Sequence, residues 1–156
     1  MRHHFALVAV TVAALWPASL TGASASVDAS GTAGALAGTW GTAAEVLGTA
    51  ALNQGGIALT TSVSCASAGN CSAGGQYMDA SVHRQAFVVS QVNGTWQAAI
   101  EVPGTAALNQ GGNAEISSVS CASVGSCSAG GYYRDAFSQH QAFVVSQVNG
   151  TWHAAI

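Results

Sequence analysis

The chain has 156 residues, of which three are basic and six are acidic, so its formal net charge is −3. A nucleic-acid-binding domain needs a cluster of basic side chains to neutralise phosphates, and a protein that binds anionic lipid surfaces needs a similar cluster. The basic residues here are Arg2, Arg84 and Arg134, which lie far apart in the sequence. We therefore expect no nucleic-acid partner and no binding to a membrane surface.

Residues 1–25 have the pattern of a secretory signal peptide. A short basic start precedes an apolar run from Phe5 to Trp16, and Ala23-Ser24-Ala25 supplies small residues for cleavage. A membrane anchor is the alternative, but the run has only 12 residues, whereas a transmembrane helix needs about 20. We predict cleavage after Ala25 and an extracellular mature protein without a membrane anchor.

Two gapless repeats make up most of the remaining chain. Residues 45–100 align with residues 101–156, and 42 of the 56 aligned positions are identical. A partial copy precedes them, because Gly38-Thr39-Trp40 matches Gly94-Thr95-Trp96. The predicted organisation is a flexible leader at 26–37 and a β-repeat domain at 38–156, divided into a partial strand at 38–46, a repeat at 47–100 and a repeat at 101–156.

Each repeat contains four strand-like runs. In the second repeat these runs are 116–123, 127–134, 141–148 and 151–156. Asn149-Gly150 joins the last two runs, as Asn93-Gly94 does in the first repeat, and this dipeptide is typical of a two-residue hairpin turn with positive φ at both positions. We therefore expect an all-β fold with four short antiparallel strands in each repeat.

The third strand of each repeat indicates how the sheets pack. The run 86–89 is apolar throughout and does not alternate with polar residues, as expected for a strand that is covered on both faces. The connection 103–113 is long enough to cross the about 14 Å from the outer edge of one sheet to the first strand of the next. We expect the two sheets to stack on one another.

The repeated pattern resembles a known group of proteins. Its elements are Ser-Val-Ser-Cys, Cys-Ser-Ala-Gly-Gly, Gln-Ala-Phe-Val-Val-Ser and Asn-Gly-Thr-Trp, with a period of 56 residues. It is similar to the repeats of secreted actinobacterial β-propeller-like proteins of unassigned function. The resemblance covers residues 38–156 and implies two propeller-blade-like repeats. A propeller needs about four to eight blades to close, so two repeats imply an incomplete propeller. A two-sheet β-sandwich, a ring of several chains and a fragment of a larger propeller all stay open.

Four cysteines form two pairs with the same spacing, Cys65 with Cys71 and Cys121 with Cys127. Each pair brackets the turn between the first two strands, where facing Cα atoms lie about 4.5–5.5 Å apart, within disulfide range. An even number of cysteines in an exported chain also favours disulfides. A four-thiolate zinc site and free thiols are the alternatives, but structural zinc favours two to four residues between paired ligands. We predict two disulfides and no metal.

Most catalytic signatures are missing from the sequence. It has no Gly-x-Ser-x-Gly or His-Glu-x-x-His motif, and it has no lysine for a P-loop or a Schiff base. Residues 90–96 weakly resemble the Asp-box of sialidase-type propellers, but no aspartate precedes the turn. The two arginines of the predicted mature chain, Arg84 and Arg134, also do not supply the arginine cluster that such a resemblance implies. We expect a secreted, non-catalytic protein with a binding or structural role and no cofactor. The alternatives are a sialidase-like hydrolase and a truncated fragment of a larger propeller.

The differences between the repeats suggest where a ligand binds. Ten of the fourteen differing positions lie in the connection before the first strand, in the adjoining ends of the first two strands, or in the loop between the second and third strands. These segments share one rim of an up-and-down sheet, and aromatic and arginine residues are typical binding anchors, although loops also tolerate change without function. The candidate ligand rim comprises Tyr77, His83, Arg84, Tyr132, Tyr133, Arg134, Phe137 and His140. Its ligand is expected to be extracellular, either a glycan or a protein, and association of several copies of the chain stays open.

Overall fold

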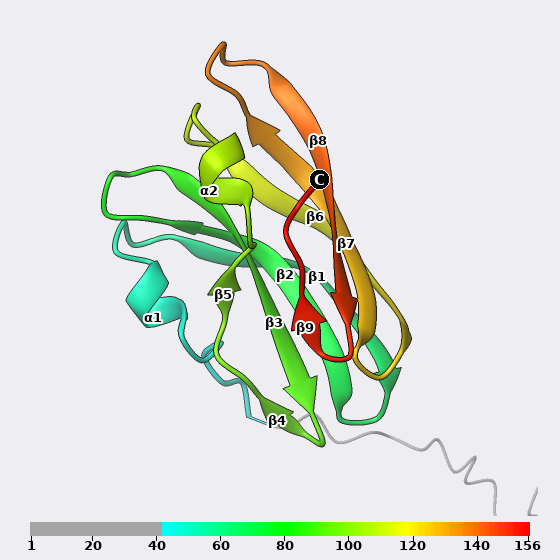
Figure 1. Cartoon of the computed structure of the whole chain (residues 1–156). Coiled ribbons are helices and arrows are strands. Elements are labelled where there is room, and N and C mark those ends of the chain that lie inside the picture. Colours follow the sequence, from blue (N-terminus) through cyan, green and yellow to red (C-terminus); the bar gives the residue numbers. More distant parts are fainter. Residues whose placement is uncertain (1–41) are drawn as a thin grey trace, which may run out of the picture. The chain divides into compact units, whose positions relative to one another are not determined.

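A computed structural model describes residues 42–156 and contains two antiparallel sheets joined by one connection (Figure 1). The predicted all-β fold is confirmed. The predicted signal peptide, the leader and residues 38–41 of the predicted partial strand lie outside the described residues, and residues 42–46 are not in a strand.

The strands follow the repeats. The first sheet contains β1 (Ala58–Ser67), β2 (Asn70–Met78), β3 (Arg84–Val92), β4 (Thr95–Trp96) and β5 (Ile100–Glu101). The second sheet contains β6 (Ala114–Ser123), β7 (Ser126–Arg134), β8 (His140–Val148) and β9 (Thr151–Trp152). In both sheets the first four strands lie in chain order. β5 pairs with the middle of β3, at Phe87 and Val88, whereas β4 pairs with its end, at Gln91 and Val92.

The first three strands of each repeat are confirmed to within two residues, whereas the predicted fourth strand is interrupted. β4 is only two residues long, and the chain rejoins β3 at β5. Between them, the N–H of Ala99 donates to the carbonyl oxygen of Leu47 at 2.7 Å instead of to β3. The second repeat is built alike, with Ala155 bonded to Pro103 at 2.8 Å. The segment that precedes each sheet therefore accepts a backbone hydrogen bond that an unbroken fourth strand would donate to the third.

The Asn-Gly turns have the predicted geometry. Asn93 and Gly94 have φ values of 48° and 83°, and Asn149 and Gly150 have values of 51° and 81°. Positive φ at both central residues matches the right-handed twist of the flanking strands. These turns lie at the same end of the molecule as the cysteine hairpins (Figure 1), since the N–H of Gly94 donates to Gly69 at 2.8 Å.

Each connection contains one helical turn that periodicity did not predict, because four residues are too few to show a period. The turns are α1 (Thr49–Leu52) and α2 (Thr105–Leu108). In α2 the hydroxyl of Thr105 donates to the carbonyl oxygen of Val102 at 2.7 Å, and Thr49 makes the same bond to Val46 at 2.6 Å. The segment before the first sheet therefore repeats the conformation of the connection between the sheets.

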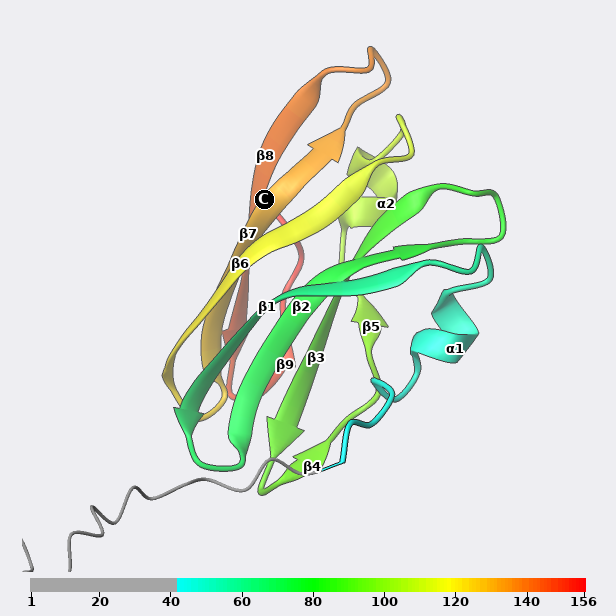
Figure 2. The same ribbon diagram turned by 180° about the vertical axis from the view of Figure 1, so that it is seen from behind.

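The two sheets stack through opposite faces. Alternation along the strands gives each sheet a serine face and a phenylalanine face. In the first sheet the serine face carries Ser62, Ser64, Ser72, Gly74, Ala86, Val88 and Ser90, and the phenylalanine face carries Val63, Ala73, Phe87 and Val89. The serine face of the first sheet packs against the phenylalanine face of the second, mainly through β6. Figure 2 shows β6 beside β1 along this junction.

The main core fills the space between the sheets. Ile116, Val102 and Val88 are almost completely buried there, and Phe143 of the second sheet packs with them. The other face of the first sheet is covered by its own preceding segment, where Val46 and Leu52 pack on a smaller cluster.

Coverage of the third strand differs between the repeats. Residues 86–89 are all at most 2 % exposed, as predicted for a strand covered on both faces. In the second repeat Phe143 and Val145 are buried, but Ala142 is exposed and Val144 is 54 % exposed. The serine face of the second sheet is therefore open, and the same sequence alternates between buried and exposed positions there.

Candidate functional site

Both predicted disulfides are present, and no cysteine in the described part of the chain is free. Cys65 faces Cys71 and Cys121 faces Cys127 across the first hairpin of each sheet, with Cα atoms 3.9 and 4.0 Å apart. We call Cys65–Cys71 the outer disulfide and Cys121–Cys127 the inner disulfide. Two such bonds are compatible with an oxidising, extracellular location.

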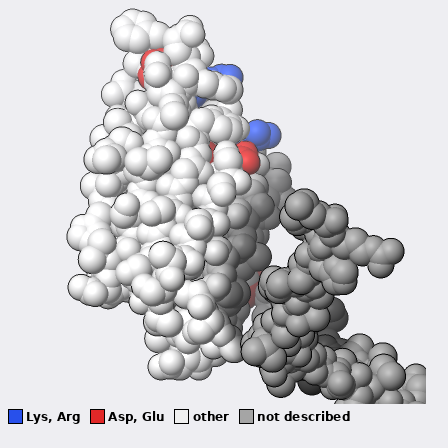
Figure 3. All heavy atoms as spheres, turned by 90° about the vertical axis from the view of Figure 1, so that its right-hand side faces the viewer, with Lys and Arg blue, Asp and Glu red and all other residues white. Residues whose placement is uncertain are grey.

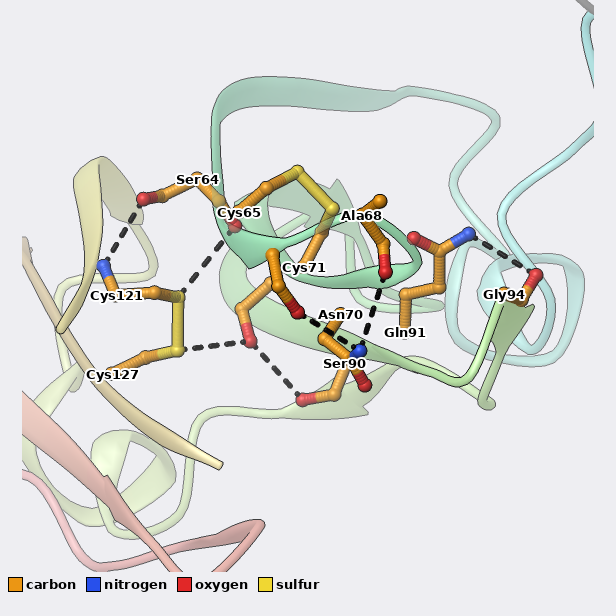
Figure 4. Close-up of a disulfide and its surroundings, with 12 residues drawn as sticks. Ser64, Cys65, Ala68, Asn70, Cys71, Ser90, Gln91, Gly94, Cys121 and Cys127 are labelled. Carbon is orange, nitrogen blue, oxygen red and sulfur yellow. Dashed lines mark hydrogen bonds between the residues drawn. A yellow bond between two sulfur atoms is a disulfide. The ribbon is translucent and has the colours of Figure 1, made fainter. Parts of the chain in front are cut away.

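The inner disulfide lies in the junction between the sheets (Figure 4). The N–H of Cys121 donates to Ser64 Oγ at 3.0 Å, and Cys121 Sγ lies 3.6 Å from the carbonyl oxygen of Ser64. Cys127 Sγ lies 3.4 Å from Ser72 Oγ. The inner disulfide therefore closes its hairpin and also contacts the neighbouring sheet.

Two further serines accept hydrogen bonds across the junction. Ser62 Oγ accepts the N–H of Val119 at 3.0 Å. Ser90 Oγ accepts Gln147 Nε2 at 2.8 Å and Trp152 Nε1 at 3.2 Å. Polar groups buried between packed sheets must be paired, so these serines determine how the sheets fit. Sequence reasoning missed them because the same serines recur in both repeats and were interpreted only as part of the fold.

Two tyrosines of the candidate ligand rim pack against the interior, with Tyr77 buried and Tyr133 half-buried. Tyr77 is 4 % exposed, and its hydroxyl donates to Glu101 Oε2 at 3.1 Å. Burial raises the pKa of this hydroxyl far above its usual value, and the Glu101 carboxylate raises the pKa further. Tyr133 occupies the equivalent position in the second repeat and packs on the main core, with its ring 6.5 Å from that of Phe143.

The rim residues of the second sheet form a cluster at the end where β7 joins β8 (Figure 1). The rings of Tyr132 and His140 stack with centroids 4.9 Å apart. Arg134 Nη2 lies 3.5 Å from His140 Nε2, and the Tyr132 hydroxyl donates to Glu115 Oε2 at 3.4 Å. Phe137, at the tip of the loop, is 83 % exposed. We call Tyr132, Arg134, Phe137 and His140 the rim cluster.

The remaining two rim residues, His83 and Arg84, belong to the first sheet, and both are exposed. The N–H of Arg84 donates to the carbonyl oxygen of Gly112 at 3.0 Å, and Asn109 Nδ2 donates to the carbonyl oxygen of Arg84 at 2.8 Å. The backbone of Arg84 thus holds the connection between the sheets.

Asp79 and Asp135 shape the loops between the second and third strands. Asp135 Oδ1 accepts the backbone N–H groups of Phe137 and Gln139, each at 2.9 Å, and its Oδ2 accepts Gln141 Nε2 at 2.9 Å. Hydrogen bonds from Gln141 and these N–H groups lower the pKa of Asp135. Asp79 makes equivalent bonds; burial opposes its ionisation, but the bonds outweigh burial and lower its pKa.

A groove of about 290 Å³ runs between the two sheets at the opposite end from the rim cluster. It is lined by both cysteine hairpins and by polar groups including Asn70, Gln91 and Asn149. Within residues 42–156, no group of three or more histidine, cysteine or acidic side chains is arranged to hold a metal ion. The described helices include none with the length and apolarity to cross a membrane.

No protein-family model matches this chain, and no curated protein matches it in sequence. Its function is therefore inferred from its own residues and geometry.

Proposed function

We propose that the chain is a secreted, non-catalytic β-repeat protein that binds an extracellular ligand through the rim cluster. The observation that carries the proposal is the grouping of an exposed Phe137 with the stacked Tyr132–His140 pair and the Arg134 guanidinium on one loop end. Aromatic and arginine side chains are the residue types that most often dominate binding energy. Two β-strands hold the base of this loop, so its geometry is set before a ligand arrives.

The chemistry of the rim cluster favours a glycan over a strongly charged ligand. Aromatic rings offer apolar surfaces with polar edges, and sugar rings have apolar faces bordered by hydroxyl groups. Arg134 supplies donors and Glu115 supplies acceptors, so both hydrogen-bonding roles of a hydroxyl are present. The guanidinium of Arg134 lies 3.5 Å from His140, and the Glu115 carboxylate bonds Tyr132 in the same cluster, so the cluster offers little net charge for a polyanion.

A non-catalytic role is supported by the two recurring aspartates. Asp79 and Asp135 each use both carboxylate oxygens to fix their own loops. They occupy equivalent positions in the two repeats, as expected for residues that maintain the repeat rather than a unique reaction centre.

The test is glycan-array binding by the protein recovered from an export-competent host. Phe137→Ala with His140→Ala should abolish binding without lowering the melting temperature, because both side chains are exposed. Val124→Ala, at an exposed site on the opposite end, is the matched control. Binding that survives the double substitution would refute the assignment of the rim cluster.

Two further readouts address catalysis and export. Turnover of any arrayed glycan that disappears in Asp135→Ala would contradict the non-catalytic proposal. Intact mass of the recovered protein should correspond to a chain that starts at Ser26, and retention of residues 1–25 would contradict the predicted signal peptide.

A further inference from the structure

The two outward faces of the described domain are copies of the two faces that meet inside it. The phenylalanine face of the first sheet is equivalent to the buried phenylalanine face of the second; its preceding segment already covers Phe87 and Val89, and its exposed part includes Val63 and Trp96. The open serine face of the second sheet is equivalent to the buried serine face of the first. Exposure shows the difference. Val88 is 0 % exposed, whereas its equivalent Val144 is 54 % exposed; Val119 is 7 % exposed, whereas Val63 is 60 % exposed.

The hydrogen-bonding groups of the junction also recur at the two outward faces. Ser62, Ser64, Ser72 and Ser90 accept or contact groups of the second sheet. Their equivalents on the second sheet are identical residues and are all exposed: Ser118, Ser120, Ser128 and Ser146. The partner groups recur on the first sheet, at the edge strand β1 and on β3 and β4: the backbone N–H groups of Val63 and Cys65, and the side chains of Gln91 and Trp96.

The open serine face carries little charge. Figure 3 views the side of the molecule on which the second sheet lies in Figure 1, and most of that side is uncharged, with charged groups gathered mainly toward one end. A surface of small polar and apolar residues suits a second sheet better than a charged ligand, since no charge has to be desolvated on docking.

From these matches we propose that a second copy of the chain docks head-to-tail. The serine face of the second sheet in one copy receives the phenylalanine face and edge strand of the first sheet in the next, in the arrangement that the internal junction already uses. In such a contact Ser118 and Ser120 accept the N–H groups of Val63 and Cys65, and Ser146 accepts the indole N–H of Trp96.

One difference between the repeats sets the strength of this contact. In the internal junction Ile116 is completely buried over Gly74. At the outward faces the equivalent pair is Thr60 and Gly130, so the contact loses most of the apolar side chain that centres the junction. The contact between copies is therefore weaker than the covalently linked junction, and association depends on protein concentration.

The contact uses two different faces, so it is heterologous and leads either to a closed ring or to an open filament. If the ring has the roughly four to eight blades typical of propellers, it contains about two to four copies of this chain.

The test blocks each face separately. Val144→Arg places a charge on the serine face, and Val63→Arg places one on the phenylalanine face. Each variant alone should be monomeric by sedimentation velocity at concentrations where the unmodified protein associates, with affinity reduced at least about a hundredfold by an unpaired buried charge. Mixed in equal amounts, the two variants should form a dimer and nothing larger, because one intact copy of each face remains.

Val148→Arg is the matched control. Val148 lies on the same strand as Val144 and is 50 % exposed, but its equivalent Val92 is still 44 % exposed beside the internal junction. This substitution should leave association unchanged. All three valines are at least half exposed, so the melting temperatures of the monomers should agree.

Three results would overturn the proposal. The unmodified protein could stay monomeric at every soluble concentration, which would mean that another occupant covers these faces. Val144→Arg or Val63→Arg could associate normally, or their mixture could stay monomeric. In the internal junction Gln76, the equivalent of Tyr132, is buried, so docking of a second copy and glycan binding share the Tyr132 end of the serine face. The two proposals are still tested separately, because docking is measured by sedimentation and glycan binding by the Phe137→Ala/His140→Ala variant.

Discussion

Substitution of Gly74 is a sharp test of the packing between the sheets, because the equivalent Gly130 in the second repeat serves as an internal control. A Cβ atom at Gly74 would lie 2.8 Å from Ile116 Cγ2 and 3.1 Å from Ile116 Cβ. Ile116 is completely buried and β-branched, so it has little freedom to move away. A Cβ atom at the equivalent Gly130 would meet only Phe143 O at 3.7 Å and Val144 Cγ1 at 3.8 Å, which are ordinary contacts.

The expected magnitudes follow from these distances. Overpacking a filled core destabilises by about 1–3 kcal/mol, so Gly74→Ala should lower the free energy of unfolding by this amount. Gly130→Ala meets no obstacle within the chain and should stabilise by about 0.4–1 kcal/mol, because it restricts the unfolded chain. The two substitutions should therefore differ by at least about 1.4 kcal/mol. Removing Ile116 should reverse the effect, since the added methyl group then fills part of the cavity.

The assay is urea unfolding of Gly74→Ala, Gly130→Ala, Ile116→Ala and the Gly74→Ala/Ile116→Ala double variant, at concentrations too low for association. Ile116→Ala alone should cost about 2–5 kcal/mol. In the double-mutant cycle, Gly74→Ala should become neutral or favourable, which corresponds to a coupling of about 1–3 kcal/mol. Equal effects at Gly74 and Gly130, or a Gly74→Ala cost that persists without Ile116, would refute the described packing of β6 on the first sheet.

Replacing both cysteines of the inner disulfide by serine should lower the free energy of unfolding, measured in urea, more than replacing those of the outer disulfide. Each replacement loses about 2 kcal/mol of loop-closure stabilisation, but the inner disulfide also contacts the other sheet. Equal losses would contradict that role. In acid, the lowered pKa values of Asp79 and Asp135 mean that their stabilisation is present above the unfolded value of about 3.9 and is lost as pH falls through their folded pKa values. The melting temperature should therefore drop in this window, and a variant with both residues replaced by asparagine should show a flatter profile; an unchanged profile would count against the loop bonds. In alkali the pH dependence has the opposite direction, because folding raises the pKa of Tyr77. Its contribution to the free energy of unfolding is full below about pH 10 and is lost as pH rises toward its folded pKa. The tyrosinate absorbance that Tyr77→Phe removes should appear only as the sheet circular dichroism is lost, and its appearance in folded protein would be inconsistent with the buried hydroxyl.

The parts of the fold that depend on local chemistry could be predicted from the sequence. The cysteine spacing and the Asn-Gly turns define hairpins within a few residues, so three strands in each repeat were predicted closely. The interruption of the fourth strand could not be predicted, because it depends on the carbonyl oxygen of Leu47, about fifty residues before Ala99 in the chain. The exposure of Val144 depends on what lies over its sheet, and an identical sequence is buried in the other repeat.

Residue type alone does not distinguish the exposed residues of the candidate site from the buried ones. Tyr77 and Tyr133 were grouped with Tyr132 because all three are aromatic and close to a variable loop. Successive residues of a strand point to opposite faces, so Tyr132 and Tyr133 cannot share a surface. Counting along β7 from Ser128 would have separated them without a structure. Two of the junction serines gave a similar signal, because Ser62 and Ser64 stand two positions apart on β1 and so share one face, but the repeat comparison could not distinguish them from the rest of the fold.

The cysteine hairpins have a consequence for how the chain is oxidised. Each disulfide joins residues only six apart, whereas a bond between the repeats would close a loop of at least fifty residues. Loop-closure entropy disfavours the longer loop by about 2 kcal/mol. Incorrect pairing is therefore disfavoured even in the unfolded chain, before any sheet has formed. If the chain is exported from its N-terminus, as proposed, it presents the first pair of cysteines before the second, so each bond can close in turn without subsequent isomerisation.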